Sequence, residues 1–211
     1  MHLLPSGITS RECKLVLGCR MVVDPWVLDR ELREWAELTG EQPEGERLFI
    51  SERAAVILPF HRLYDSADKV VGTTGRGIGP AYRDRTERVG LRFVDVRLML
   101  GRDSEIGEMA RRMNDQLATV GVADRIDPEQ LGSELNWIHE RFSNAIRATG
   151  PMLDASLARG EQVLLEGAQG AMLDIDQGTY PFAVSYTHLR AHETRHDLVC
   201  RLLLEKKKKK K

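Results

Sequence analysis

The stretch QVLLEGAQG, Gln162–Gly170, places a short apolar strand directly before a glycine loop. In open α/β sheets, ligands bind beyond the carboxyl ends of the strands, where loops of this kind lie. Glycine permits positive φ and close approach of the backbone to a ligand, so the loop suits a nucleotide or another anion. The stretch therefore predicts an α/β fold with a ligand site at one edge of its sheet.

Another glycine-rich string, the first of the two in chain order, spans Gly72–Arg88 and reads GTTGRGIGPAYRDRTER. The hydroxyls of Thr73 and Thr74 and the loop N–H groups are good phosphate donors, and Arg76 adds a charged fork. The string fits neither the Walker pattern nor the dinucleotide-binding fingerprint. On these residues alone, a simple turn and a phosphate-binding loop both remain open.

Short apolar runs elsewhere in the chain predict the strands of the sheet. Asp24-Pro25 has the form of an N-cap followed by a first helical proline, and Gly40 marks the end of the helix that follows. Leu28, Leu32, Trp35 and Leu38 are expected on its apolar face. Besides 162–165, the predicted strands are Lys14–Leu17, Met21–Val23, Leu48–Ile50 and Ala55–Leu58, the last of them stopped by Pro59.

The second half of the chain is mostly helical in pattern. Helices are predicted over about Ser104–Leu117 and over Pro128–Thr149, where Leu131, Leu135, Ile138, Phe142 and Ile146 line one face. Gly150-Pro151 is expected to break the second helix before another helical segment, Met152–Ala158. The run Leu91–Leu100 is ambiguous between strand and helix. With the strands, these helices favour a predominantly parallel sheet flanked by helices.

Composition places the chain among globular proteins. Its 42% hydrophobic and 30% charged residues are ordinary for that class. It has no apolar run of about eighteen residues, so no membrane association is expected, and its start has no signal-peptide pattern. Cys13, Cys19 and Cys200 lack metal-site spacing and suggest reduced thiols in the cytoplasm, with a Cys13–Cys19 disulfide as an alternative.

The two glycine strings together resemble the adenylosuccinate synthetase family, over about Met1–Phe182. The resemblance implies an α/β, P-loop-NTPase-like fold, incomplete in this chain, with residues 1–183 as an internal part of the synthetase domain. It implies GTP-dependent ligation of IMP and L-aspartate, with Mg²⁺ and GTP as cofactors. It also implies a homodimer with shared active sites. The family's GTP phosphate loop, catalytic aspartate and histidine, and aspartate loop have no counterpart here, so the chain alone is expected to be inactive.

The resemblance also implies which residues bind IMP. They are Thr74 in the first string, Gln169, whose amide suits the donor and acceptor edge of hypoxanthine, and Arg88, which holds the 5′-phosphate in the neighbouring subunit. Arg85 stands where the family has a lysine; it keeps the charge and is the candidate catalytic residue, although a guanidinium differs from an ammonium in shape. Asp174 and Asp176 are assigned no catalysis.

The end of the chain, Val184–Lys211, differs from the rest. It holds nine basic and three acidic residues, so the preceding residues carry 22 and 29, a net charge of −7. Val184 stands where the family has a phosphate-contacting threonine, and the chain ends in six lysines. We expect a non-native tail, and neither metal binding by His188, His192 and His196 nor nucleic-acid binding. A non-catalytic nucleotide-binding or dimerisation module is the main alternative function; a basic-tailed nucleic-acid binder is a weaker one.

Overall fold

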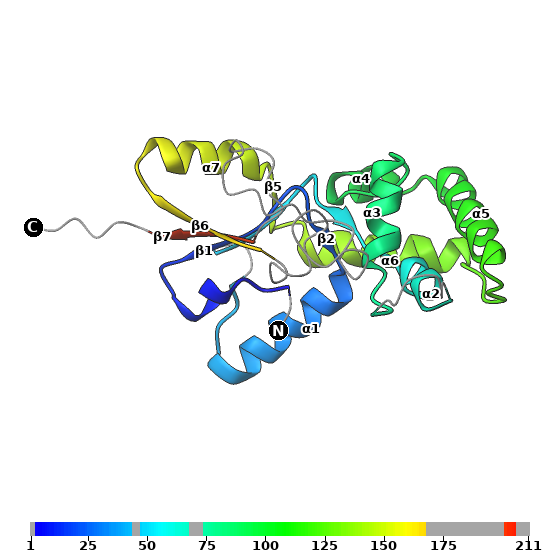
Figure 1. The fold of residues 1–211 in the computed structure, drawn as a ribbon, viewed down its shortest axis with the longest axis horizontal. Helices are drawn as coiled ribbons and strands as arrows, with labels where there is room; N and C mark the ends of the chain where they lie inside the picture. Colours follow the sequence, from blue (N-terminus) through cyan, green and yellow to red (C-terminus); the bar gives the residue numbers. More distant parts are fainter. Residues whose placement is uncertain (1–2, 44–46, 68–73, 168–200, 206–211) are drawn as a thin grey trace, which may run out of the picture. The chain divides into compact units, whose positions relative to one another are not determined.

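The computed structural model describes residues 3–43, 47–67, 74–167 and the backbone of 201–205 (Figure 1). The chain divides into two compact units. The first comprises residues 1–54 and 144–211, and the second comprises residues 55–143.

The first unit is built on a sheet with the strand order β5-β3-β1-β7-β6 among the described residues. Its strands are β1 (Lys14–Leu17), β3 (Leu48–Ser51), β5 (Ile146–Arg147), β6 (Gln162–Glu166) and β7 (Arg201–Glu205). β1, β3 and β5 pair in parallel, while β7 runs antiparallel to both β1 and β6. β6 therefore points the same way as β1, and the fold-class prediction of a predominantly parallel α/β sheet is confirmed. A further two-residue strand, β2, spans Val22–Val23.

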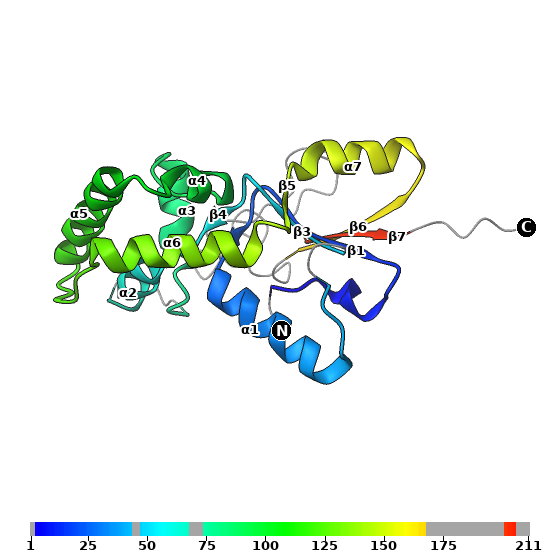
Figure 2. The ribbon, with the colours of Figure 1, turned by 180° about the vertical axis from the view of Figure 1, so that it is seen from behind.

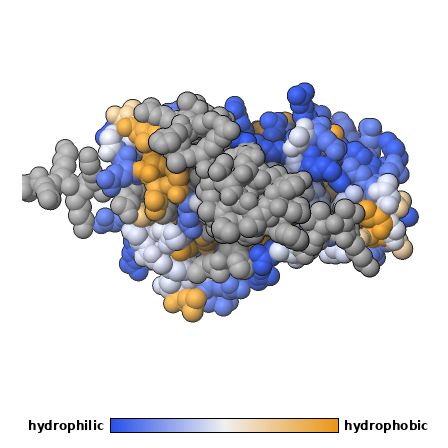
Figure 3. Space-filling model, in the orientation of Figure 1, coloured by the Kyte–Doolittle hydropathy of each residue, from blue (hydrophilic) through white to orange (hydrophobic). Residues whose placement is uncertain are grey.

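Two helices belong to this sheet. Figures 1 and 2 show α7 (Thr149–Ala158) on one side of the strands and α1 (Pro25–Thr39) on the other. Met152 and Leu153 of α7 pack against Val16, which is fully buried in β1. A short 3-10 helix, Ser6–Thr9, precedes β1. Figure 3 shows apolar surface on this unit, and Leu164 and Leu165 of β6 are 57% and 43% exposed.

α1 begins and ends where its sequence predicts. The Asp24 carboxylate accepts hydrogen bonds from the Trp26 and Val27 N–H groups, both at 3.1 Å, and Gly40 ends the helix at φ 72°. Leu28 and Leu32 are buried, but Leu38 is 78% exposed, so its predicted place on the apolar face is wrong. At 100° per residue, Leu38 lies about 80° around the helix from Leu28 and faces away from the core.

The second unit is mainly helical. It contains β4 (Ala55–Val56), α2 (Pro59–Ala67), α3 (Ile78–Thr86), α4 (Phe93–Met99), α5 (Asp103–Thr119) and α6 (Pro128–Phe142). Its core includes the edge-on ring pair Phe93 and Phe142, with centroids 6.5 Å apart, and Leu131, Leu135 and Ile138 of α6. Within the ambiguous run 91–100, Phe93–Met99 is helical.

Three of the differences between predicted and observed boundaries have a clear physical reason. Pro59 does not only stop a strand: it is the first residue of α2, since a first-turn proline loses no helical hydrogen bond. α6 ends at Phe142, and Ile146 pairs with Ile50 in the sheet instead of extending the helix. Gly150 and Pro151 lie in the first turn of α7, so they begin a helix where a break was predicted.

Candidate functional site

The described part of the first glycine string leads directly into α3. Thr74 is exposed, and the turn Gly75–Gly77 connects it to the helix. Gly75 has φ 67° and Gly77 has φ 75°, the left-handed region that side chains with a Cβ rarely adopt. The glycines are therefore required by the path of the backbone, and they leave the Thr74 side chain facing solvent.

The turn packs closely on α2. A Cβ at Gly77 would lie 2.8 Å from the His61 Cβ and 2.9 Å from the Arg62 nitrogen, and one at Gly75 would lie 3.2 Å from the Ser66 Oγ. The Gly77 N–H donates to the buried Asp65 carboxylate at 2.9 Å. α2 therefore supports the turn both by close packing and by one charge-assisted hydrogen bond.

A buried pair joins α2 to α3. His61 and Asp84 are each 2% exposed, and their Nε2 and Oδ2 atoms are 3.4 Å apart. The His61 Nδ1 accepts a hydrogen bond from the Leu58 N–H at 2.8 Å, so the ring proton lies on Nε2 and points to Asp84. Burial raises the pKa of Asp84, but the His61 hydrogen bond and the charges of Arg83 and Arg112 outweigh it, and the pKa lies below its ordinary value.

α3 ends in a Schellman motif whose left-handed residue is Arg88. The Arg88 N–H donates to the Arg85 carbonyl at 3.1 Å, and the Val89 N–H donates to the Asp84 carbonyl at 2.9 Å. Arg88 has φ 65°, where glycine is the usual residue, and it is the one non-glycine residue with positive φ in the described part of the chain. Its side chain is exposed. A second contact holds this turn, because Arg112 donates to the Val89 carbonyl at 2.9 Å.

The candidate residues predicted from the sequence are thus distributed around α3. Thr74 lies before the helix, Arg85 is half-buried in its last turn, and Arg88 follows its end. A helix of nine residues is about 14 Å long, so Thr74 and Arg88 flank α3 at opposite ends. Gln169 lies outside the described residues, as do Asp174, Asp176 and the three tail histidines.

Asp65, His61 and Asp84 also belong to this region but were not predicted from the sequence. No local pattern distinguishes them, because their partners lie 12 and 23 residues away. Only the structure shows that Asp65 and Asp84 are buried, and buried acids remain in a protein interior only when they are hydrogen-bonded or paired.

In the first unit, the stretch Gln162–Gly170 is anchored at Glu166, the last residue of β6. The Glu166 carboxylate accepts from the Ser6 N–H at 2.9 Å and from the Ser6 hydroxyl at 3.0 Å. This contact joins residues 160 positions apart and holds the end of β6 to the segment before β1. Glu166 lies three residues before Gln169.

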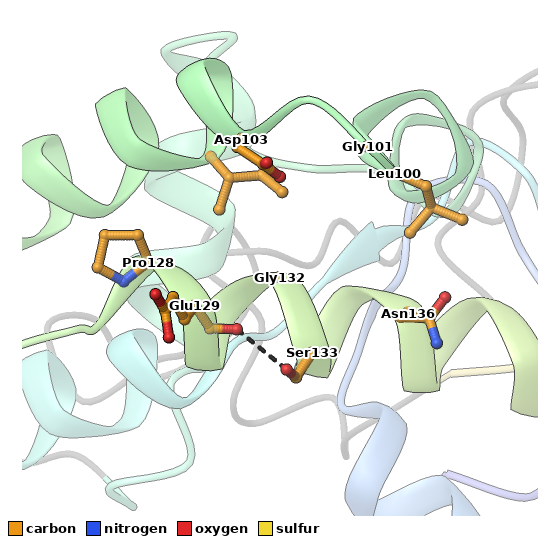
Figure 4. A pocket seen from close by; sticks show the side chains of 9 residues that line it. Leu100, Gly101, Asp103, Pro128, Glu129, Gly132, Ser133 and Asn136 are labelled. Atoms are coloured by element: carbon orange, nitrogen blue, oxygen red, sulfur yellow. Dashed lines mark hydrogen bonds between the residues drawn. The ribbon is translucent and has the colours of Figure 1, made fainter.

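A cavity of about 530 Å³ lies in the second unit, between the start of α5 and the side of α6 (Figure 4). Asp103, Glu129, Ser133 and Asn136 supply its polar groups, and the Ser133 hydroxyl donates to the Glu129 carbonyl at 3.0 Å. Among the described residues, none of the candidates Thr74, Arg85 and Arg88 lines it. The cavity and the Thr74 turn are therefore separate features.

Within the described ranges, no three His, Cys, Asp or Glu side chains group as metal ligands would. None of the described helices has the length and apolar character needed to span a membrane. Cys13 and Cys19 are both thiols, so the Cys13–Cys19 disulfide alternative is not realised.

Comparison with known proteins identifies the family. The family model of adenylosuccinate synthetase matches residues 1–196. The chain is 39% identical to adenylosuccinate synthetase of Chlorobium phaeovibrioides, covering 88% of the chain and 44% of that protein. It is 40% identical to the Desulfatibacillum aliphaticivorans enzyme, with 87% and 44% covered.

The fold gives the same result. The structure of fully ligated adenylosuccinate synthetase from Plasmodium falciparum matches with a TM-score of 0.72 and 28% identity, over 88% of this chain and 44% of that one. The chain thus spans a little under half the length of these relatives. It belongs to the adenylosuccinate synthetase family.

Proposed function

We propose that this chain supplies the IMP-binding part of an adenylosuccinate synthetase, an enzyme of purine nucleotide biosynthesis in the cytoplasm. The reaction would join IMP and L-aspartate with GTP as the phosphoryl donor. The observation that best supports this role is the form of α3 and its flanks. An exposed threonine on a glycine turn precedes the helix, and an exposed arginine in a left-handed conformation follows it.

Each candidate residue has a chemical role in this proposal. The Thr74 hydroxyl and the N–H groups of its turn would donate to IMP. The Arg88 guanidinium would bind the 5′-phosphate through two parallel hydrogen bonds, and Gln169 would recognise the hypoxanthine edge. Arg85 would supply positive charge at the lysine position of the family. Backbone strain at a residue such as Arg88 is typical of functional sites, which supports the assignment.

The positions of Thr74 and Arg88 favour a shared site. Since the two residues flank α3 at opposite ends, we propose that each α3 serves two IMP sites in a homodimer. Thr74 would bind the nucleotide of its own subunit, and Arg88 would reach the phosphate in the partner subunit. A C2 dimer makes this exchange reciprocal.

GTP and Mg²⁺ complete the proposed reaction but are not assigned residues here. When bound, Mg²⁺ would neutralise charge on the transferring phosphoryl group. The described residues offer no cluster of carboxylates suited to hold it. We expect the 211-residue chain alone to form no adenylosuccinate.

Isothermal titration of the chain with IMP tests the proposal, with CMP as the control nucleotide. We expect IMP to bind and CMP not to. Arg88→Ala should weaken IMP binding about 10- to 100-fold, because a hydrogen bond to a charged group contributes about 1.5–3 kcal/mol. Equal binding of IMP and CMP, or no binding of IMP, would reject the IMP site. The second candidate function is a non-catalytic nucleotide-binding or dimerisation module, because the chain covers only part of its relatives. IMP binding without product formation would fit this second candidate equally well.

We also propose that Val184–Lys211 is not native. The support is the valine at position 184 and the terminal lysines, although the family match extends to residue 196 and β7 lies in this segment. Sequencing the locus from independent genomic DNA tests the proposal. Recovery of the six lysine codons followed by a stop would refute it.

A further inference from the structure

Asp65 is a buried acid to which the proposed function assigns no task. It lies on α2, is 7% exposed, and is separated by 12 residues from its partner, the Gly77 N–H. Keeping a carboxylate away from water costs free energy unless hydrogen bonds compensate. The 2.9 Å bond to Gly77 is such compensation, so the two groups are strongly coupled.

The hydrogen bond from Gly77 to Asp65 fixes one peptide plane of the turn Gly75–Gly77. The Gly77 N–H belongs to the Arg76–Gly77 peptide. Gly77 adjoins this plane with φ 75°, and Gly75, one residue before the plane, has φ 67°. Glycine leaves this backbone free to adopt many other conformations. Gly75 and Gly77 have no side chains that would restrict the backbone of the turn. A contact from outside the turn must therefore select one conformation.

The element that provides this contact is itself held in place. The His61 ring accepts from the Leu58 N–H and faces Asp84 of α3, with both side chains almost fully buried. Arg83 of α3 also lies over the Tyr64 ring, with its guanidinium carbon 4.3 Å from the centroid. α2 and α3 are therefore fixed relative to each other, and Asp65 reaches the turn from a rigid support.

We propose that Asp65 is a positioning residue: it holds the turn Gly75–Gly77 in the conformation that presents the Thr74 hydroxyl to the nucleotide. This inference rests on the proposed role of Thr74 in binding IMP. Asp65 does not touch the nucleotide. It acts through the Gly77 N–H, so its loss leaves the turn with several conformations and lowers the fraction that can bind.

Three variants of the chain separate positioning from stability. Asp65→Ala removes the acceptor, whereas Asp65→Asn keeps an amide oxygen that can accept from Gly77. Asp24→Ala is the matched control, because Asp24 is also a buried acid that accepts from backbone N–H groups, but at the start of α1 in the other unit. Its loss costs about 1 kcal/mol of stability and leaves the turn unchanged.

Two measurements are made on each variant: amide hydrogen exchange at Gly77, and the Kd for IMP by isothermal titration. In Asp65→Ala, we expect Gly77 exchange to accelerate at least about tenfold and the Kd to rise about tenfold or more, which corresponds to 1.4 kcal/mol. Asp65→Asn should recover most of both values. Asp24→Ala should leave both near those of the unaltered chain.

Unchanged Gly77 exchange in Asp65→Ala would overturn the proposal, since the bond would then not hold the turn. Faster exchange with an unaltered Kd would also overturn it, because the turn conformation would not matter for binding. Equal losses in Asp65→Ala and Asp24→Ala would show a general stability effect and reject positioning. If the unaltered chain binds no IMP while Gly77 exchange responds as expected, the role of Asp65 in holding the turn stands and the IMP site is rejected.

Discussion

The backbones of Arg85 and Arg88 are hydrogen-bonded, with the Arg88 N–H 3.1 Å from the Arg85 carbonyl oxygen. This bond helps close α3 and keeps Arg88 at φ 65°. A left-handed conformation costs an L-residue with a Cβ about 1–2 kcal/mol, and glycine avoids that cost. The arginine is therefore retained at a position where stability alone would favour glycine.

Comparison of Arg88→Gly with Arg88→Ala tests this conflict between stability and function. Arg88→Gly should be more stable than Arg88→Ala by about 1 kcal/mol, because only glycine relieves the left-handed backbone. Both should lose IMP affinity to the same degree, since both lack the guanidinium. Urea unfolding and titration with IMP measure the two effects. Equal stability of the two variants would show that the turn is not strained.

Mixing two variants of the complete enzyme tests the shared site. Thr74→Ala and Arg88→Ala subunits should each be defective alone. In a mixed dimer, one site combines the intact Thr74 of one subunit with the intact Arg88 of the other. Random mixing makes half of the dimers mixed, so about a quarter of all sites should recover. Activity that stays at the level of the separate variants, with subunit exchange verified, would place both residues in the site of one subunit.

Local signals predicted part of the fold. β1 spans the predicted Lys14–Leu17, and α1 lies between the predicted Asp24 cap and Gly40. In both cases the determinants are adjacent in sequence: a short apolar run, or a cap and a proline. α2 and α3 were missed because glycine and proline usually interrupt regular structure, whereas here Pro59 begins a helix and Gly79-Pro80 lies in the first turn of another.

Tertiary contacts explain the remaining differences. Ile146 continues the apolar period of α6, yet it pairs with Ile50 in the sheet, because a strand partner was available that sequence periodicity does not show. The site was predictable only where a residue belongs to a recognisable string, as Thr74, Arg85 and Arg88 do. Asp65 of α2 contacts the string Gly72–Arg88 through one hydrogen bond, to the Gly77 N–H. A single contact of this kind leaves no periodic pattern in the sequence, so it could not be predicted.

The buried pair His61 and Asp84 predicts a pH dependence of stability. The pKa of Asp84 is lowered in the folded chain, so its ionised form stabilises the fold at pH values above its unfolded pKa, about 3.9. This stabilisation should be lost as the pH falls below about 4 and through the folded pKa. Asp84→Asn cannot ionise, so it should cost about 1–3 kcal/mol at pH 7 and progressively less in acid.

Urea unfolding at a series of pH values from 7 to 3 measures this difference. The stability curves of the unaltered chain and of Asp84→Asn should converge as the pH falls. Parallel curves over the whole range would show that Asp84 contributes no proton-linked stability.

Gly77 and Gly79, both in the string Gly72–Arg88, provide a matched test of how closely the turn Gly75–Gly77 packs on α2. Gly77→Ala should destabilise the chain by about 2–4 kcal/mol, since it combines a left-handed backbone with a Cβ closer than 3.0 Å to the His61 Cβ and the Arg62 nitrogen. Gly79 lies two residues further on, within α3, and a Cβ there meets no atom within 4 Å. Gly79→Ala should therefore stabilise the chain by up to about 1 kcal/mol through helix propensity.

Thermal and urea unfolding of the two alanine variants should consequently change in opposite directions. Amide exchange should localise the loss in Gly77→Ala to the turn and to the adjoining end of α2, because those are the groups the new methyl displaces. A Gly77→Ala variant as stable as Gly79→Ala would mean that α2 and the turn do not pack as closely as the structure shows. The proposed positioning of Thr74 by Asp65 would then be weakened, because the same close packing of α2 on the turn holds the Gly77 N–H next to the Asp65 carboxylate.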